Sequence, residues 1–121
     1  MAIPKIGESE WYVMKALWEH APLSGSDIIK AVSAETDWSQ STILTMVRRL
    51  VQKDAIGVEQ GKVMMYYPLV EEKEVKRIET DMFLKRVYKG SVGMLVKGFL
   101  ESGELSEKEL EELKKLLDSM K

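Results

Sequence analysis

The sequence predicts a mostly α-helical protein with one small β-hairpin, organised as two parts along the chain. Apolar residues recur at helical spacing through residues 8–52 and again through residues 71–121. Between these stretches, short runs of β-type residues flank a turn signal at Gly61. We therefore expect three helices, then a hairpin, then further helices.

The first two helices are separated by a clear break. The first is expected over residues 8–20, and Pro22 ends it because proline disfavours a helical conformation in the residue before it. Ser24, with Asp27 three residues later, is typical of a helix start, and the second helix is expected to end near Glu35. The apolar face of the first helix, which we expect in the core, consists of Trp11, Met14, Leu17 and Trp18.

The third helix has the most regular pattern in the chain. It is expected to begin after Ser39 and to end at Asp54, with Trp38 anchoring its start against the core. Its apolar side consists of Ile43, Met46, Val47, Leu50 and Val51. Within an arc of about 120° on the opposite side lie Ser41, Thr42, Thr45, Arg48, Arg49 and Gln52.

Two short strands are expected after the third helix, over residues 55–60 and 63–69, joined by a turn at Gly61 and Lys62. Tyr66 and Tyr67 then point to opposite faces of the second strand, so one is expected in the core and the other outside. Three helices followed by a hairpin predict a winged helix-turn-helix domain in residues 1–70.

Residues 71–121 carry only helical signals, and the clearest of them is a capping box formed by Ser106 and Glu109. About 50 residues of amphipathic helix are marginally stable alone. We therefore expect an all-helical dimerisation domain that buries its apolar stripes against a second copy. The alternative is that these helices pack back on their own N-terminal domain.

Composition excludes several classes of protein. The chain has no cysteine, so disulfides and thiolate metal sites are impossible, and we expect no metal and no cofactor. His20 is the only histidine, and neither a phosphate-binding loop nor a partnered nucleophile is present, which argues against an enzyme. We find no signal peptide and no apolar run of about 20 residues that could insert into a membrane, and therefore expect a cytoplasmic protein.

The polar side of the third helix predicts a DNA-binding surface. The net charge is −2, but residues 41–62 carry four Lys or Arg against two Asp or Glu. A helix in the major groove needs small polar residues facing the bases and basic residues for phosphates. We expect Thr42, Thr45 and Arg49 to contact bases or the adjacent backbone. We expect phosphate contacts from Ser41, Arg48 and Lys62.

Such a protein would bind double-stranded operator DNA as a homodimer. A two-fold dimer places two recognition helices about 34 Å apart, or a multiple of that distance, which matches a palindromic operator. Two other interpretations stay open. Winged helices also serve as protein-interaction adaptors, and the helical part could hold a small molecule that regulates the protein.

A series of short motifs runs along the whole chain. In order they are Glu10-Trp11-x-Val13-Met14, Asp37-Trp38-Ser39-x-x-Thr42-Ile43-x-Thr45, Arg49-Leu50, Tyr67-x-Leu69-Val70, Val87-Tyr88-Lys89-Gly90, Leu95-Val96-x-x-Phe99 and Leu105-Ser106-x-x-Glu109-Leu110-Glu111-Glu112-Leu113. The joint order of these motifs resembles the penicillinase repressor family. The resemblance implies a homodimeric winged-helix repressor of antibiotic-resistance operons. It also implies inactivation when a membrane sensor-protease cuts the C-terminal region.

The chain departs from the family pattern at two positions. The family is cut at an Asn-Phe bond, and here Gly98 precedes Phe99, so the resemblance makes Gly98–Phe99 a candidate cleavage site. Leu44 stands where the family often has arginine, so affinity or base preference is expected to differ. Copper-responsive relatives use a cysteine-rich site, which this chain without cysteine does not have.

Overall fold

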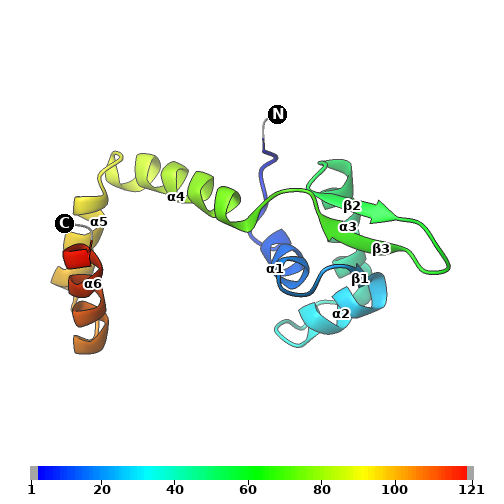
Figure 1. The fold of residues 1–121 in the computed structure, drawn as a ribbon, viewed down its shortest axis with the longest axis horizontal. Helices are drawn as coiled ribbons and strands as arrows, with labels where there is room; N and C mark the ends of the chain where they lie inside the picture. The colour runs from blue at the N-terminus through cyan, green and yellow to red at the C-terminus, as the bar shows by residue number, and fades with distance from the viewer. Residues whose placement is uncertain (1–2, 120–121) are drawn as a thin grey trace. The chain divides into compact units, whose positions relative to one another are not determined.

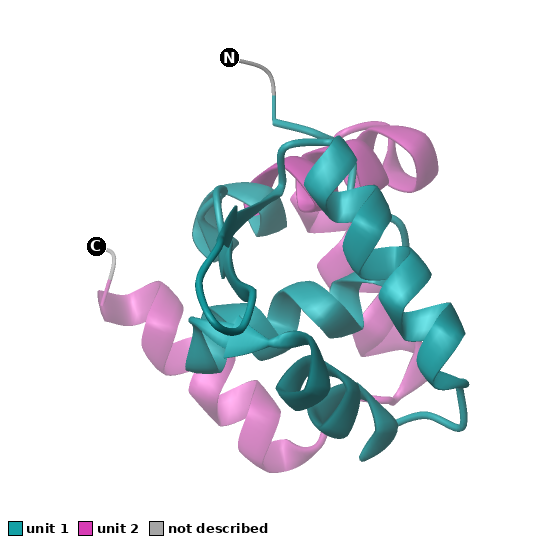
Figure 2. Cartoon of the chain, turned by 90° about the vertical axis from the view of Figure 1, so that its right-hand side faces the viewer, with its two compact units in different colours: residues 1–76 teal, residues 77–121 magenta. Residues whose placement is uncertain are grey.

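A computed structural model describes residues 3–119. The chain divides into two compact units, residues 1–76 and residues 77–121 (Figure 2). Helix α4 (Glu72–Tyr88) begins in the first unit and continues into the second. The mostly helical fold with a small β-hairpin is confirmed, whereas the functional division at residue 70 stays a prediction.

The first unit consists of three helices and a small antiparallel sheet (Figure 1). Its elements, before α4, are α1 (Glu10–His20), β1 (Leu23–Ser24), α2 (Gly25–Ser33), α3 (Gln40–Gln52), β2 (Ile56–Glu59) and β3 (Met65–Pro68). The strand order is β1-β3-β2, and Tyr66 in β3 pairs with both Leu23 and Val58. The sequence does not predict strand β1, because two residues are too few to show an alternating pattern.

Serine side chains begin both α2 and α3, as the sequence predicts. Ser24 Oγ accepts a hydrogen bond from the backbone N–H of Asp27 at 3.1 Å. Ser39 Oγ accepts one from the backbone N–H of Thr42 at 3.2 Å. Each bond satisfies a donor that has no partner within its own helix. The start of α3, the helix with the regular polar side, is therefore set locally by Ser39.

The hairpin differs from its predicted form. The expected two-residue turn at Gly61 and Lys62 is wrong, because β2 ends at Glu59 and β3 begins at Met65. The connecting loop therefore comprises residues 60–64, and we call this loop the wing tip. The strands are shorter than expected because Val63 and Met64 leave the sheet and are exposed.

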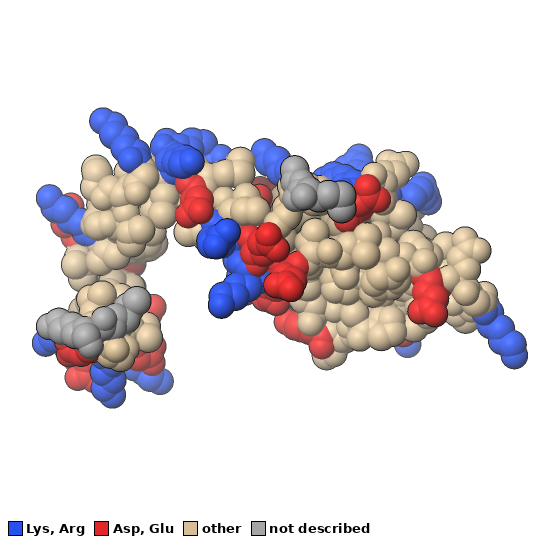
Figure 3. Space-filling view, turned by 45° about the horizontal axis from the view of Figure 1, so that its top comes forward, with Lys and Arg blue, Asp and Glu red and all other residues tan. Residues whose placement is uncertain are grey.

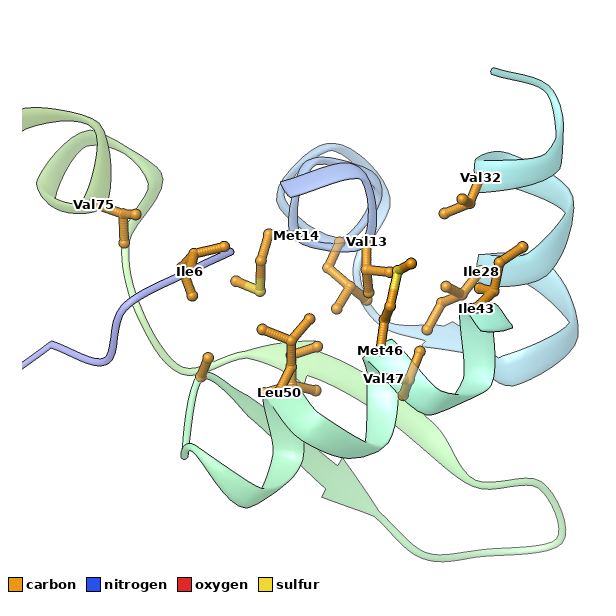
Figure 4. Packing of buried hydrophobic residues seen from close by; sticks show 13 residues of the cluster. Ile6, Val13, Met14, Ile28, Val32, Ile43, Met46, Val47, Leu50 and Val75 are labelled. Atoms are coloured by element: carbon orange, nitrogen blue, oxygen red, sulfur yellow. The ribbon is translucent and has the colours of Figure 1, made fainter. Parts of the chain in front are cut away.

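One hydrophobic core holds the three helices and the sheet of the first unit together (Figure 4). The largest fully buried side chains of this core are Met14, Leu17, Ile28, Ile43, Leu50, Ile56, Val13 and Val32. The core therefore confirms the predicted apolar sides of the three helices. Burying a side chain of this size contributes about 1.5–3 kcal/mol relative to leaving it in water. The core therefore fixes the orientation of α3 and leaves its polar side outside.

The three tryptophans and Tyr66 pack against the core, which confirms the predictions made for the tryptophans and for one tyrosine of β3. Trp18 donates a hydrogen bond from Nε1 to the carbonyl oxygen of Val70 at 2.9 Å. Trp38 packs edge-on against Tyr12 with ring centroids 5.0 Å apart. Tyr66 is half-buried against the core, whereas Tyr67, the next residue of β3, is exposed.

A buried ion pair joins the end of α3 to the N-terminal segment. The Glu10 carboxylate is buried, and its Oε1 lies 2.5 Å from Nζ of Lys53. The same oxygen accepts a hydrogen bond from the backbone N–H of Gly7 at 2.7 Å. Lys53 Nζ also donates to the carbonyl oxygen of Lys5 at 3.0 Å. The C-terminal end of α3 is thus tied to two other segments.

The second unit contains the remainder of α4, then α5 (Val92–Ser102) and α6 (Glu107–Ser119). The predicted capping box is present, because Ser106 and Glu109 bond each other's backbone N–H groups. Gly103 ends α5 in the left-handed conformation, with φ of 71°, which glycine adopts without strain. No helix within residues 3–119 combines the length and the apolar character that a bilayer-crossing segment requires.

Apolar side chains of the second unit are largely exposed. Within residues 77–119, Leu84 is the only buried apolar residue. The exposed ones are Met82, Phe83, Val87, Val92, Met94, Phe99, Leu100, Leu110, Leu116 and Leu117. This unit has the expected helices but does not bury their stripes by itself.

Candidate nucleic-acid interface

The polar side of α3 is solvent-exposed along its whole length. Ser41, Thr42, Arg48 and Arg49 are exposed, and Thr45 is half-buried beside them. The apolar side of the same helix is buried, so packing decides which residues face out. The structure thereby brings five of the six predicted DNA-binding residues onto one surface.

A cluster of hydroxyl groups occupies the N-terminal end of this surface. Ser39 Oγ lies 2.9 Å from Oγ1 of Thr42 and 3.1 Å from Oγ of Ser41. Thr45 donates its hydroxyl proton to the carbonyl oxygen of Ser41 at 2.8 Å. In this arrangement Thr45 offers a methyl group and an acceptor oxygen, but no free donor. Ser39, which the sequence marks only as a cap, belongs to the same cluster.

The two arginines of α3 are available for a ligand. Among residues 3–119 neither Arg48 nor Arg49 has an ion-pair partner, and both are exposed. A guanidinium without an internal partner can bind phosphate or guanine bidentately. On the face drawn in Figure 3, basic and acidic side chains are interspersed, and neither sign covers the whole face.

The sixth predicted residue, Lys62, lies in the wing tip and is exposed. The hairpin that carries the wing tip borders α3, and a cleft of about 300 Å³ separates the two. The residues lining this cleft are Leu44, Val47, Arg48, Val51, Val58, Met64 and Tyr66. The wing tip and the arginine side of α3 thus belong to one continuous surface. Met64 is absent from the residues that the sequence predicts for this surface, although two apolar residues, Val63 and Met64, directly follow Lys62 in the sequence.

The candidate cleavage site lies in the second unit. Gly98 and Phe99 are inside α5, and Phe99 is exposed while Gly98 is half-buried. In residues 3–119, no group of three or more metal-ligating side chains is close enough to hold an ion. His20 is exposed at the end of α1.

Comparison with known proteins agrees with this geometry. A family model described as penicillinase repressor matches residues 6–119. The penicillinase repressor of Bacillus licheniformis is 36% identical over 120 residues, covering 98% of this chain and 94% of that protein. The methicillin resistance regulatory protein MecI of Staphylococcus aureus strain N315 is 37% identical over 115 residues, which cover 94% of each chain.

Solved structures are similar to the first unit in particular. The solution structure of the DNA-binding domain of the repressor BlaI has a TM-score of 0.55 and 36% identity, covering 60% of this chain and 90% of that one. The Bacillus licheniformis BlaI monomer in complex with the blaP half-operator has a TM-score of 0.54, with the same identity and coverage. MepR, a transcription regulator of a Staphylococcus aureus multidrug efflux pump, has a TM-score of 0.50, covers 95% of this chain and 77% of that one, and at 21% identity is similar in fold alone.

A packed helix-turn-helix, a β-hairpin wing and an exposed hydroxyl-and-arginine surface define the class of the protein as a winged-helix, DNA-binding transcription repressor. Within that class, the chain belongs to the penicillinase repressor family.

Proposed function

We propose that the protein represses transcription as a homodimer that covers a palindromic operator, and that it controls genes for resistance to β-lactam antibiotics. The observation that carries the proposal is the polar side of α3, which is exposed on a helix whose other side is fully packed. Curated relatives that control penicillinase and methicillin resistance support the class of target gene. We also propose a cytoplasmic location, because a repressor has to reach the DNA and bacterial DNA lies in the cytoplasm.

The proposed contacts divide into two kinds. Thr42, Thr45 and Arg49 contact bases or the backbone beside them, because their spacing of three and four residues places them in one row along the exposed side of α3. Phosphate contacts come from Ser41, Arg48 and Lys62, which flank that position on the helix and in the wing tip. The hydrogen bond from Thr45 to Ser41 favours methyl contact with thymine over hydrogen-bond donation by Thr45.

Dimerisation is proposed for the second unit, because its apolar stripes have no cover within residues 77–119. On α6, Leu116 and Leu117 are 62% and 58% exposed. Exposed apolar patches of this kind mark protein interfaces. Burial against a second copy also supplies the two-fold symmetry that a palindromic operator requires.

Release of the operator is proposed to follow cleavage of the Gly98–Phe99 bond by a membrane sensor-protease. The bond lies in the middle of α5, so local unwinding of this helix has to precede cutting. Mass spectrometry of the repressor after incubation with its cognate sensor-protease tests this step. A fragment that ends at Gly98 is the expected product, and an uncut chain or a different fragment would refute the assignment.

Binding to the promoter DNA upstream of the protein's own gene tests the proposed function. Fluorescence anisotropy at several salt concentrations should show specific binding that weakens steeply with salt, because phosphate contacts release counterions. Arg49→Ala should weaken binding by about 1–3 kcal/mol if its contact is bidentate to guanine. Arg86→Ala removes the same charge from an exposed position on α4 and serves as the matched control.

Each result has a defined meaning. If Arg49→Ala binds the operator with unchanged affinity, Arg49 does not contact the DNA, but the protein can still be a DNA-binding repressor. Absence of specific binding by the unchanged protein at low salt would contradict the operator proposal and direct the search to protein partners instead.

A further inference from the structure

The wing tip, residues 60–64, exposes two adjacent apolar side chains. Val63 is 59% exposed and Met64 is 46% exposed, although hairpin loops are normally polar. The neighbours in the loop are Gln60, Gly61 and Lys62, so the segment carries a positive charge and no acidic residue. An apolar pair beside a single cation is not explained by solubility or by the turn itself.

The position of Met64 connects this pair to the DNA-binding surface. Met64 lines the cleft between the hairpin and α3 together with Arg48, one of the proposed phosphate contacts. Leu44, at the border of the polar side of α3, lines the same cleft. Within the first unit, the loop extends beyond the paired strands (Figure 1). The apolar pair therefore continues the α3 surface outward, where DNA flanking the major-groove contact would lie.

We propose that Val63 and Met64 are specificity-determining residues that pack into the minor groove next to the base pairs contacted by α3. Their apolar surface contacts deoxyribose and the edges of the groove floor, while Lys62 lies against a phosphate. Apolar side chains of this type are used by minor-groove binding proteins to widen and bend the duplex, which favours base steps that deform easily. The inference rests on the proposed function, because it adds a contact to the same complex.

Salt dependence separates this contact from a charge contact. An apolar contact releases no counterions, so its loss lowers affinity equally at every salt concentration. Loss of a phosphate contact instead lowers the slope of log affinity against log salt by about one. The wing tip offers both kinds of residue within three positions, so the two effects can be measured in one loop.

The experiment uses the full chain and two duplexes that carry its operator, one with native flanks and one truncated at the edge of the sequence contacted by α3. The test variant is Val63→Thr with Met64→Gln, which keeps side-chain size and removes apolar character. On the long duplex its affinity should fall about tenfold at all salt concentrations, with an unchanged salt slope. On the truncated duplex it should bind as the unchanged protein does.

Two controls complete the design. Lys62→Gln should lower the salt slope on the long duplex. Leu69→Gln alters an apolar side chain that is 51% exposed outside the wing tip, and should leave affinity unchanged. Thermal unfolding of each variant verifies that the winged helix is intact, since the altered residues contribute little to the core.

Three outcomes would overturn the inference while leaving the proposed function standing. The first is equal affinity of the double variant and the unchanged protein on the long duplex. The second is a loss of the same size on both duplexes. The third is a change of oligomeric state without DNA, which would mean that the wing tip packs on a second copy. If the unchanged protein fails to bind its operator specifically, the proposed function fails first.

Discussion

The two units of this chain both consist largely of amphipathic helices, but only the first unit buries the apolar sides of its helices. In the first unit, the apolar sides of α1, α2 and α3 meet in one core, and most of their large apolar residues are inaccessible to water. In the second unit, α5 and α6 have equally clear apolar sides, yet neither helix has a buried residue. The difference is not in helix capping, because both units have serine caps with the expected hydrogen bonds.

What differs is whether a covering surface exists within the unit. Three helices and a sheet enclose a volume, whereas the second unit has too few elements to enclose one. An unpaired amphipathic helix gains little free energy from its apolar side until something covers it. The first unit is therefore expected to fold by itself, and the second to depend on association.

The largest expected effect comes from opening the enclosed core. Leu50→Ala removes a fully buried side chain from α3 and should lower the free energy of unfolding by about 2–5 kcal/mol. Chemical denaturation followed by tryptophan fluorescence measures this loss, since the three tryptophans lie in the first unit. Leu116→Ala, at an exposed position of α6, is the matched control and should leave this transition within about 0.5 kcal/mol. Equal losses would mean that the two units unfold together.

A smaller effect is expected at the buried ion pair. Lys53→Met leaves the Glu10 carboxylate buried without its cation, which should destabilise the first unit by about 2–3 kcal/mol. The loss is expected to lie below that of fully buried pairs because the Lys53 side chain is 35% exposed. Adding Glu10→Gln to this variant should restore part of the stability. No restoration in the double variant would show that packing, not charge, dominates at this site.

Association of the second unit is tested by a charge on its apolar stripe. Leu117→Glu places a carboxylate where the proposed dimer buries a leucine, and should weaken the dimer by about 1.5–3 kcal/mol, roughly 10- to 150-fold. Sedimentation equilibrium over a range of concentrations measures the change, with Leu117→Met as the control. A dimer of unchanged strength would place the interface elsewhere.

The smallest expected effect is the loss of a helix cap, which can be tested once in each unit. Ser39→Ala removes the cap of α3 and Ser106→Ala removes the capping box of α6, each worth about 1 kcal/mol to its own helix. Circular dichroism and denaturation should detect the first change as lower stability of the winged helix. The second should be visible as a weaker dimer. If Ser106→Ala instead lowers the stability of an isolated monomer, the second unit folds without a partner.

Local patterns predict most of the elements of the first unit. Ser24 and Ser39 start α2 and α3 where the sequence indicates, because a cap acts within three residues of itself. The polar side of α3 follows from helical rotation alone, so the sequence groups five of the candidate contact residues correctly. Their roles toward DNA stay predictions, because helical rotation decides which residues share a side and not what that side binds.

The sequence by itself determined the helices, their caps and the side of α3 that faces out, because each depends on residues within about two turns. Tertiary structure decided the sheet and the wing. Strand β1 exists only because Tyr66 on β3 is there to pair with, and Gly57 is required where a Cβ would lie 2.4 Å from the Tyr67 ring. The Glu10–Lys53 pair and the cleft shared by Arg48 and Met64 join residues that are distant in sequence. Periodicity does not encode such contacts, since they arise only when the core brings separate elements together.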